Sequence, residues 1–355
     1  MASKVYFTKA GKNGGLPRGR LGKLFEAAGF GECFSEGEFV ALKIHFGEAG
    51  NRDVWQPEQV REIVKKVRTA GAKPFLTDAN VLYRSPRHNA VDHLITAHGN
   101  GFNYESCGAP LVIADGLHGD NSLELEIPGG KHYRKARIAA EIARADAVIS
   151  LTHVTGHIAF GLGAAIKNLG MGSGSSAGKQ MMHAHFRPEP DASKCIACGA
   201  CARHCPVDAI TVPKGKKARV DEEKCVGCGE CVAHCPTGAI PVDWGDSEGL
   251  QERTAEFCAA IMNGRPERFG FLSLLTGVTE MCDCMGSRGK KVCADIGALA
   301  SSDMVAIDQA TMDLLEERGG LKGLKSACPG CEFGRGQEAA EKLGLGTREY
   351  ELVEV

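Results

Sequence analysis

The chain has 355 residues, of which 43% are hydrophobic and 24% are charged, and its formal net charge at pH 7 is −2. This composition excludes a mainly disordered chain, because the apolar fraction is high and the net charge is low. A charge so near zero also argues against nucleic acid or an anionic membrane as a partner, since both attract a basic excess.

The spacing of apolar residues predicts alternating strands and helices along the chain. The expected strands are residues 4–9, 38–45, 73–78 and 147–154. The expected helices are residues 56–71, 138–145, a segment around 160–169, 251–262 and 302–317. Strands that alternate with helices favour a layered α/β fold with a largely parallel sheet.

Eight of the 16 cysteines lie between Cys195 and Cys235, in two copies of the pattern C-x2-C-x2-C-x3-C-P. This run binds 4Fe–4S clusters in bacterial ferredoxins, where the fourth cysteine of each run binds the other cluster. We therefore expect two 4Fe–4S clusters. The first would be held by Cys195, Cys198, Cys201 and Cys235, and the second by Cys225, Cys228, Cys231 and Cys205. Two zinc ribbons are the alternative, but zinc sites do not need two such interleaved runs.

These runs, with short expected strands at 210–212 and 240–242, predict a ferredoxin-like (α+β) insert over residues 188–244. Residues 1–187 would form the first part of the α/β host domain, and residues 245–355 its second part. The α/β pattern lies on both sides of the insert. The host therefore would be one domain that the insert interrupts.

Polar side chains stand at four places that we interpret as strand ends, where α/β folds bind their ligands. The four sets are Lys43, His45 and Glu48; Asp78, Asn80 and Tyr83; His153, His157, Lys167 and Asn168; and His183 and His185. Each residue alone is more often structural, but together they predict one pocket. Lysine and asparagine side chains bind carboxylates or phosphates, and histidines donate protons or bind metals. Residues 172–179 resemble a P-loop superficially, but Gln180 stands where Ser or Thr is required.

The remaining cysteines allow several interpretations. Cys282 and Cys284, with Cys328 and Cys331, could hold a third cluster or a metal ion such as zinc, act as redox dithiols, or be inert. The isolated Cys33, Cys107 and Cys258 are expected to be small buried residues.

The N-terminal sequence MASKVYFTKAGKNGG has no apolar run typical of a secretory signal. No stretch approaches the roughly 18 apolar residues of a membrane span. We therefore expect a cytoplasmic protein, in which cysteines serve as metal ligands or redox groups.

The chain resembles a known family in the order of its motifs. The motifs are ALKIHFGE, PFLTDAN, NAVDHL, GAPLVIADGL, LTHVTGH, GAAIKNLGMG, the double ferredoxin run, CDC and DIGALASSDMVAIDQA. They resemble the family known as domain of unknown function 362, in its ferredoxin-fused form, over nearly the whole chain. The resemblance implies the fold and 4Fe–4S binding but no substrate. The chain departs from the family after Cys284, where MGSRGKKVC and a later CPGC replace a tryptophan-containing segment.

These observations predict an iron–sulfur oxidoreductase of anaerobic metabolism. Its clusters would relay electrons between an external donor or acceptor, such as a ferredoxin or a redox enzyme, and an anionic small molecule in the pocket. One alternative is a non-catalytic electron-transfer or assembly subunit that docks on a larger redox enzyme. Another is a metal-site enzyme in which the clusters are only structural.

Overall fold

The computed structural model describes residues 2–51, 54–82, 85–183, 189–205, 207–225, 231, 234–240, 249–284 and 289–355. Its strands are β1 (Ser3–Lys9), β2 (Phe39–Ile44), β3 (Lys73–Asp78), β4 (Leu111–Ile113), β5 (Ser122–Glu126), β6 (Lys135–Ala139), β7 (Ala147–His153), β8 (Thr155–His157), β9 (Gly161–Gly163), β10 (Ile210–Thr211), β11 (Arg219–Val220), β12 (Phe269–Leu275), β13 (Gly297–Ser301) and β14 (Tyr350–Glu354). The α-helices are α1 (Arg20–Ala27), α2 (Pro57–Thr69), α3 (Ala90–Gly99), α4 (Tyr104–Cys107), α5 (Ala140–Arg144), α6 (Ala165–Ser173), α7 (Ser176–His183), α8 (Ala200–Arg203), α10 (Leu250–Met262), α11 (Met304–Glu317), α12 (Gly320–Ala327) and α13 (Arg335–Lys342). Two short 3-10 helices are η1 (Phe30–Cys33) and η2 (Pro266–Arg268).

One large sheet organises the fold, with eight strands in the order β14-β1-β13-β12-β7-β2-β3-β4. Strands β12, β7, β2, β3 and β4 pair in parallel. Only β13 among these eight strands runs against its neighbours, β1 and β12. The expected α/β fold with a largely parallel sheet is therefore confirmed. The carboxyl ends of β2, β3 and β7 meet at one edge of this sheet.

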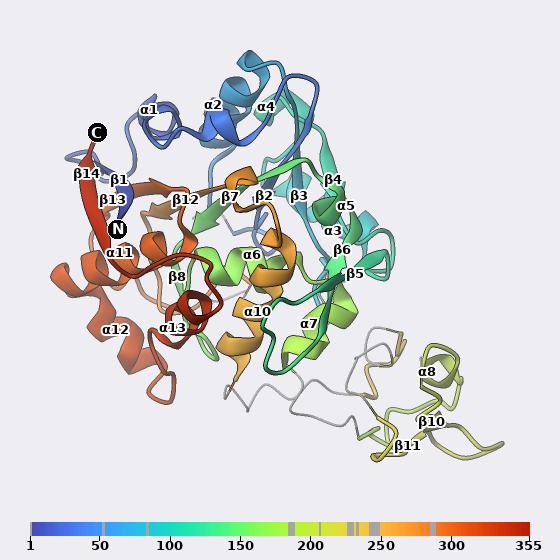
Figure 1. The fold of residues 1–355 in the computed structure, drawn as a ribbon. Helices are drawn as coiled ribbons and strands as arrows, with labels where there is room; N and C mark the ends of the chain where they lie inside the picture. The colour runs from blue at the N-terminus through green and yellow to red at the C-terminus, as the bar shows by residue number, and fades with distance from the viewer. Residues whose placement is uncertain are drawn as a thin grey trace.

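Helices cover both faces of the sheet (Figure 1). In β2, Val40 and Leu42 belong to the core on the side of α1 and α2, whereas Ala41 belongs to the core on the side of α6, α10 and α11. Lys43 follows Ala41 by two positions, and side chains two apart on a strand share a face. Lys43 is therefore directed toward α6.

Two expected helices begin later than the sequence predicts. The segment 138–145 starts as the end of β6, which pairs with β5, and becomes helical only at Ala140. The segment around 160–169 starts as strand β9, and α6 begins at Ala165. Gly161, with φ +75°, allows the chain to turn tightly between β8 and β9. Gly161 and Gly163 therefore belong to a hairpin that precedes the helix.

The cysteine-rich segment lies beside the layers built on the large sheet, past α7, and contains α8 and the β10–β11 pair (Figure 1). The expected strand at 210–212 is present as Ile210–Thr211, paired with Arg219–Val220. Of the expected strand at 240–242, Ile240 is described without strand structure, and 241–242 lie outside the described residues. Cys195, Cys201 and Cys231 share a small apolar core with Leu82, which follows β3 in the chain.

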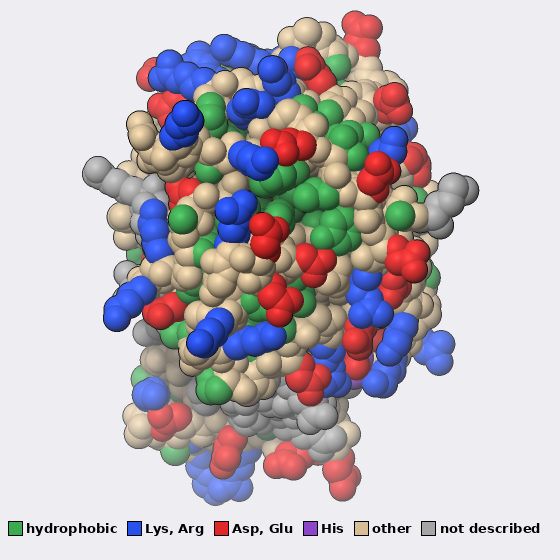
Figure 2. Space-filling model, turned by 90° about the vertical axis from the view of Figure 1, so that its left-hand side faces the viewer, with side chains coloured by type: hydrophobic (Ala, Val, Ile, Leu, Met, Phe, Trp, Pro, Cys, Tyr) green, Lys and Arg blue, Asp and Glu red, His purple; other side chains and the backbone are tan. Residues whose placement is uncertain are grey.

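No helix in the described part of the chain has the length and apolar character needed to cross a bilayer. Figure 2 shows acidic and basic side chains interspersed over the side where both termini lie, in keeping with the net charge of −2.

Candidate anion-binding pocket

A cavity of about 120 Å³ lies at the carboxyl ends of β2 and β3, beside α6 and α7. Seven of the twelve residues in the four predicted sets line it: Lys43, His45, Asp78, His157, Lys167, Asn168 and His183. A smaller cavity of about 50 Å³ shares His45, Lys167, Asn168 and Cys284 with it and is also lined by His153. The strand-end residues are therefore brought together, and their chemical roles remain a prediction.

Lys43 and Asp78 form a buried ion pair in the cavity wall, with 3.0 Å between Nζ and Oδ1. Burial alone would raise the pKa of Asp78, but the nearby Lys43, His45, His93 and Lys179, of which Lys43 contributes most, together outweigh burial and hold the pKa below its ordinary range. Lys43 also donates a hydrogen bond to Asn168 Oδ1 at 2.9 Å. The amide nitrogen of Asn168 donates to Ser150 Oγ and the Leu151 carbonyl oxygen. The charge of Lys43 is therefore compensated within the protein, and Asn168 is fixed in place.

Lys167 differs from Lys43 because its ammonium has no hydrogen bond or ion pair with any described residue. Burial is the main cause that lowers its pKa to about 8, and Asp283 opposes this effect. The amide nitrogens of Ala165 and Ile166, at the start of α6, donate to the Asp308 carboxylate at 2.7 and 3.0 Å. Asp308 of α11 thereby fixes the helix that carries Lys167 into both cavities.

His45 and His157 are both held as neutral rings that can donate from Nε2. The Nδ1 atom of His45 accepts the amide proton of Gly47 at 2.9 Å, and Nδ1 of His157 accepts from Phe160 at 3.0 Å and from Ala159 at 3.2 Å. A ring nitrogen that accepts carries no proton, so the proton of a neutral ring lies on Nε2. Burial, with help from Arg87, lowers the pKa of His45 to about 3, and burial lowers that of His157 well below its ordinary value.

His153 is committed to partners within the protein. Its Nδ1 lies 2.7 Å from Asp283 Oδ2, and its Nε2 lies 2.8 Å from the Thr276 carbonyl oxygen. Asp283 stands between Cys282 and Cys284, so this contact attaches the C-D-C segment to the end of β7. The amide nitrogen of Asn51 reaches the Asp283 side chain from the other side at 3.4 Å.

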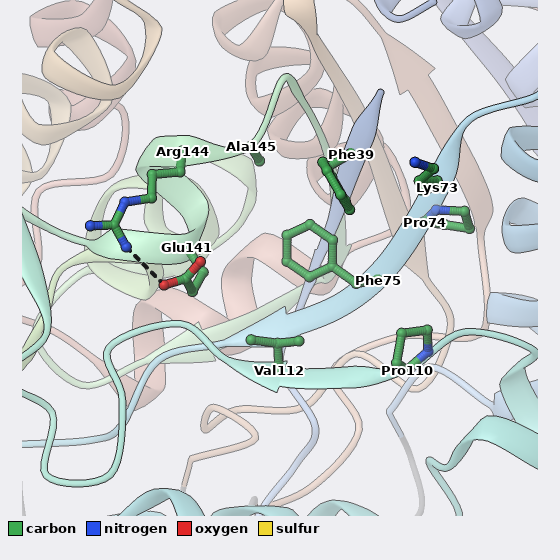
Figure 3. A pocket seen from close by; sticks show the side chains of 9 residues that line it. All are labelled: Phe39, Lys73, Pro74, Phe75, Pro110, Val112, Glu141, Arg144 and Ala145. Carbon is green, nitrogen blue, oxygen red and sulfur yellow. Dashed lines mark hydrogen bonds and ion pairs between the residues drawn. The ribbon is translucent and has the colours of Figure 1, made fainter. Parts of the chain in front are cut away.

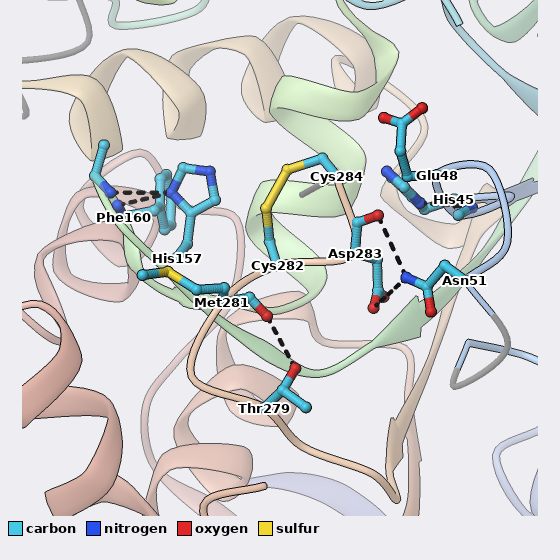
Figure 4. The surroundings of a disulfide bond; sticks show 12 residues. His45, Glu48, Asn51, His157, Phe160, Thr279, Met281, Cys282, Asp283 and Cys284 are labelled. Carbon is cyan, nitrogen blue, oxygen red and sulfur yellow. Dashed lines mark hydrogen bonds between the residues drawn. A yellow bond between two sulfur atoms is a disulfide. The ribbon is translucent and has the colours of Figure 1, made fainter. Parts of the chain in front are cut away.

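Cys282 and Cys284 form a disulfide in the wall of the smaller cavity, with His157 on one side and Asp283 on the other (Figure 4). Their sulfurs and a ring nitrogen of His157 all lie within 4.8 Å of one another, a group that could hold a metal ion. Among the described residues, no other group of three or more such ligands is that close. Cys328 and Cys331 form a second disulfide, whose sulfurs contact the carbonyl oxygen of Ile158, and they are not part of this group.

Backbone N–H groups and neighbouring thiols act on several of the ferredoxin-type cysteines. Burial raises the pKa of Cys201, and the thiols of Cys235, Cys195 and Cys198 raise it further. The amide nitrogens of Ala209 and Ala239 donate to the sulfurs of Cys205 and Cys235, each at 3.2 Å. Cys225 is half-buried and Cys231 buried, and Cys228 lies outside the described residues.

The remaining residues of the expected sets have structural partners or are not described. Glu48 pairs with the buried Arg87 at 3.0 Å, and Asn80 donates to Asp115 Oδ1 at 3.0 Å. Tyr83 and His185 lie outside the described residues. The isolated cysteines Cys33, Cys107 and Cys258 are all buried, as expected.

His183 lies in the cavity wall as a buried ring. Burial and the neighbouring Lys167 ammonium lower the pKa of His183 to about 3.

Several residues of the site were not found from the sequence. Lys179 and Arg87 line the cavity, and burial lowers the pKa of Lys179 to about 8. His93 lies 3.8 Å from Asp78, and Asp308 holds α6. Asp308 lies in the VAIDQA segment and Lys179 in GSGSSAGK; both segments stood out in the sequence, but neither residue was assigned to the pocket. No spacing rule connects either of them to β2.

A larger hollow of about 380 Å³ lies at the opposite, amino ends of the parallel strands (Figure 3). Phe39 begins β2, Lys73 begins β3, and Arg144 and Ala145 precede β7. Its Arg144 pairs with Glu141 at 3.0 Å. In open α/β sheets ligands bind at the carboxyl ends, so the smaller, charged cavity is the better candidate.

A family model described as "Domain of unknown function (DUF362)" matches residues 40–313. No curated protein matches the chain. One similar solved structure is that of the lactate racemase apoprotein from Thermoanaerobacterium thermosaccharolyticum, with 13% identity, a TM-score of 0.35, and coverage of 91% of this chain and 56% of that one. The chain thus spans little more than half the length of that structure.

Proposed function

This chain belongs to the family described as Domain of unknown function (DUF362), and we propose that it is an iron–sulfur redox protein that binds a small anion. The anion would occupy the cavity beside Lys167. Two 4Fe–4S clusters would be held by the cysteine-rich segment. When bound, such clusters supply or accept single electrons. The reaction on the anion would be an oxidation or a reduction.

The observation that carries the anion site is the free ammonium of Lys167. The other cationic side chains of the cavity have partners inside the protein: Lys43 pairs with Asp78 at 3.0 Å, Arg87 pairs with Glu48 at 3.0 Å, and Lys179 donates a hydrogen bond to the Gly174 carbonyl oxygen. Lys167 has no such partner among the described residues, although it lines both cavities. A partly buried cation is costly unless an anion pairs with it. A carboxylate or phosphate would therefore gain the strongest single attraction at this position.

Neutral imidazole donors would complete the anion site. With Nδ1 accepting from the backbone, His45 and His157 each present an N–H at Nε2. The buried Nε2 of His45 has no partner among the described residues. Such donors hydrogen-bond to an anion without adding charge, and their low pKa values keep them unchanged near neutral pH. Lys43 and Asn168 would hold the floor of the cavity in shape.

The donor set of the first cluster supports the iron–sulfur part of the proposal. Cys201 interacts electrostatically with Cys195 and Cys198 of its own run and with Cys235 of the second run. This is the interleaved set that two-cluster ferredoxins use. Hydrogen bonds from Thr237, Ala239 and Ile240 outweigh burial and lower the pKa of Cys235, which favours the thiolate that binds iron. These observations support a 4Fe–4S cluster at this set of cysteines.

Cys205, Cys225, Cys228 and Cys231 would hold the second cluster. Cys205 accepts a backbone hydrogen bond from Ala209, as Cys235 does from Ala239. Hydrogen bonds to cluster sulfurs are one means by which proteins adjust reduction potentials. The equivalent bonds in both runs support a pair of related sites.

Leu82 supports a link between the two parts. It lines the anion cavity and also packs in the apolar core that contains Cys195 and Cys201. The candidate anion site and the first cluster's cysteines therefore share a neighbour. A short distance between redox groups and substrate is what electron transfer requires.

Calorimetric titration of the anaerobically purified full chain with acetate and with inorganic phosphate tests the anion site. We expect one bound anion per chain, and a loss of affinity of at least about ten-fold in Lys167→Met, because the lost charge is partly buried. Lys322→Met, which removes an exposed lysine, is the matched control and should bind as the wild type does. Equal binding by all three proteins would reject the site.

A further inference from the structure

The disulfide between Cys282 and Cys284 stands where the proposed anion would bind. Cys284 lines both cavities, together with Lys167, and Cys282 lines the smaller one. Cys284 is partly exposed, whereas Cys282 is 5% exposed. A ligand held by Lys167 would therefore reach the sulfur of Cys284 first.

The C-D-C segment is held firmly, although it lies next to residues outside the described part of the chain. Asp283 is bound by His153 at 2.7 Å, and its backbone oxygen accepts from the Glu48 amide at 3.2 Å. The side chain between the two sulfurs is thus fixed on β7, and the sulfurs are presented to the cavity. Groups that react in a site are commonly held by buried neighbours in this way.

The residues around Cys282 and Cys284 favour a redox-active pair of cysteines over a metal site. A histidine that binds a metal almost always donates its second ring N–H to an acceptor. His157 does the reverse, because its Nδ1 accepts the amide protons of Ala159 and Phe160. A metal at Cys282, Cys284 and His157 would have to displace those hydrogen bonds or the Nε2 proton. A nearby cation such as Lys167, by contrast, stabilises a thiolate as it forms.

We propose that Cys282–Cys284 is a redox-active disulfide that opens by exchange with a small anionic thiol whose acidic group is held by Lys167. The ligand class is a thiol that also carries a carboxylate, sulfonate or phosphate. This inference rests on the anion site of the proposed function and does not depend on the clusters. It gives the pocket a covalent chemistry that the host domain performs with its own residues.

The exchange balances in two steps. The thiolate of the ligand attacks the sulfur of Cys284, the S–S bond breaks, and the electron pair goes to Cys282 as a thiolate. A second ligand thiolate attacks the ligand sulfur of this mixed disulfide and releases Cys284 as a thiolate. The two cysteine thiolates take up the protons that the two ligand thiols gave to solvent. In sum, two ligand thiols are oxidised to one disulfide and the protein disulfide is reduced to two thiols.

The test compares mercaptoacetate, an anionic thiol, with 2-mercaptoethanol, a neutral one. The experiment uses the Cys328→Ser/Cys331→Ser protein, so that opening of the second disulfide does not contribute to the alkylation signal. Opening is followed by acid quenching, alkylation and mass mapping of Cys282 and Cys284. Rates are divided by those of each thiol with a small model disulfide, which removes differences in intrinsic reactivity.

We expect mercaptoacetate to open the pair about ten-fold faster than 2-mercaptoethanol after this correction, since one charge pair is gained. The preference should disappear in Lys167→Met and persist in Lys167→Arg. If the Cys328→Ser/Cys331→Ser protein does not fold, the same mapping on the wild-type chain separates the two pairs by peptide.

Three results would overturn the inference: a pair that stays closed in the folded protein, equal corrected rates for the two thiols, or a stoichiometric metal that protects both sulfurs from alkylation. Acetate binding that depends on Lys167, together with a closed pair, would reject this inference and leave the proposed anion site standing. Absence of acetate binding together with equal corrected rates would reject both.

Discussion

His153 is bound at both ring nitrogens, to Asp283 Oδ2 at 2.7 Å and to the Thr276 carbonyl oxygen at 2.8 Å. A carbonyl oxygen can only accept, so Nε2 carries a proton, and Nδ1 faces a carboxylate. This arrangement suits an imidazolium–carboxylate pair, and both side chains are buried. His153 thus positions the C-D-C segment and has no free nitrogen for the proton transfer that its sequence position suggested.

Replacing His153 by alanine should lower the free energy of unfolding by about 3–5 kcal/mol, because the buried Asp283 carboxylate would lose its contact with the imidazole. Denaturant unfolding measures the loss. Hydrogen exchange should show residues 280–284 losing protection before the rest of the sheet does. A double variant with Asp283→Ala should lose less than the sum of the single losses, and full additivity would contradict a direct pair.

Anion affinity should depend on pH through Lys167. Burial lowers its pKa to about 8, so the ammonium that attracts the anion is present below that pH and is lost above it. Binding of acetate should therefore be constant from about pH 6 to 7 and weaken progressively above about pH 8. Calorimetry across this range measures the change.

Lys167→Arg is the control for this pH profile, since arginine stays charged throughout. It should bind with little change across the same range. Lys179, whose pKa also lies at about 8, lines the same cavity. A profile that still falls near pH 8 in Lys167→Arg would assign the effect to Lys179.

The glycines of the KNLGMG segment should tolerate alanine differently. A Cβ on Gly170 would lie 2.4 Å from the Thr254 carbonyl oxygen of α10, which is backbone and cannot move freely. A Cβ on Gly172 would meet the end of the flexible Lys43 side chain at 2.7 Å. Gly170→Ala should therefore lower the free energy of unfolding by about 1–3 kcal/mol. Gly172→Ala should mainly weaken acetate binding, as measured by calorimetry. A larger loss of stability in Gly172→Ala than in Gly170→Ala, with weaker acetate binding only in Gly170→Ala, would contradict this packing.

Asp308→Ala should detach the start of α6. Two backbone N–H groups, of Ala165 and Ile166, would lose their acceptor. We expect a loss of about 1–2 kcal/mol, as for a helix cap, with weaker acetate binding because Lys167 would be less well placed. Glu316→Ala, which changes an exposed residue of the same helix α11, should leave unfolding and binding unchanged. Similar effects of both changes would exclude a specific role for Asp308.

The sequence was informative where a short pattern determines local structure. Strand β7 is buried throughout, and β2 and β3 are buried over most of their length; the three strands end close to His153, Lys43 and Asp78, as expected. The boundary between β6 and α5 was missed, because alanines and isoleucine suit both structures and pairing with β5 decides between them. Strands β12 and β13 were not predicted, and β13 is a short run of small residues, GALAS, that has no helical or strand signature of its own.

The sequence predicted many of the residues that form the site. It did not predict which of these residues pair with one another. The rule that ligands bind at strand ends identified seven of the residues that line the cavity. It could not show that Lys43 is neutralised by Asp78 while Lys167 is free, since both lysines look alike in sequence. Nor could it show that Asp283 binds His153, because their separation of 130 residues depends on the whole fold.

The iron–sulfur claim is tested most directly by iron and acid-labile sulfide analysis of the anaerobically purified full chain, with Cys235→Ser and Cys293→Ser as a matched pair of variants. Cys235 belongs to the proposed first cluster and Cys293 to none. The account predicts about eight irons and eight sulfides per chain in the wild type and in Cys293→Ser, and a marked loss of both in Cys235→Ser. Zinc in place of iron, or equal iron in both variants, would contradict it.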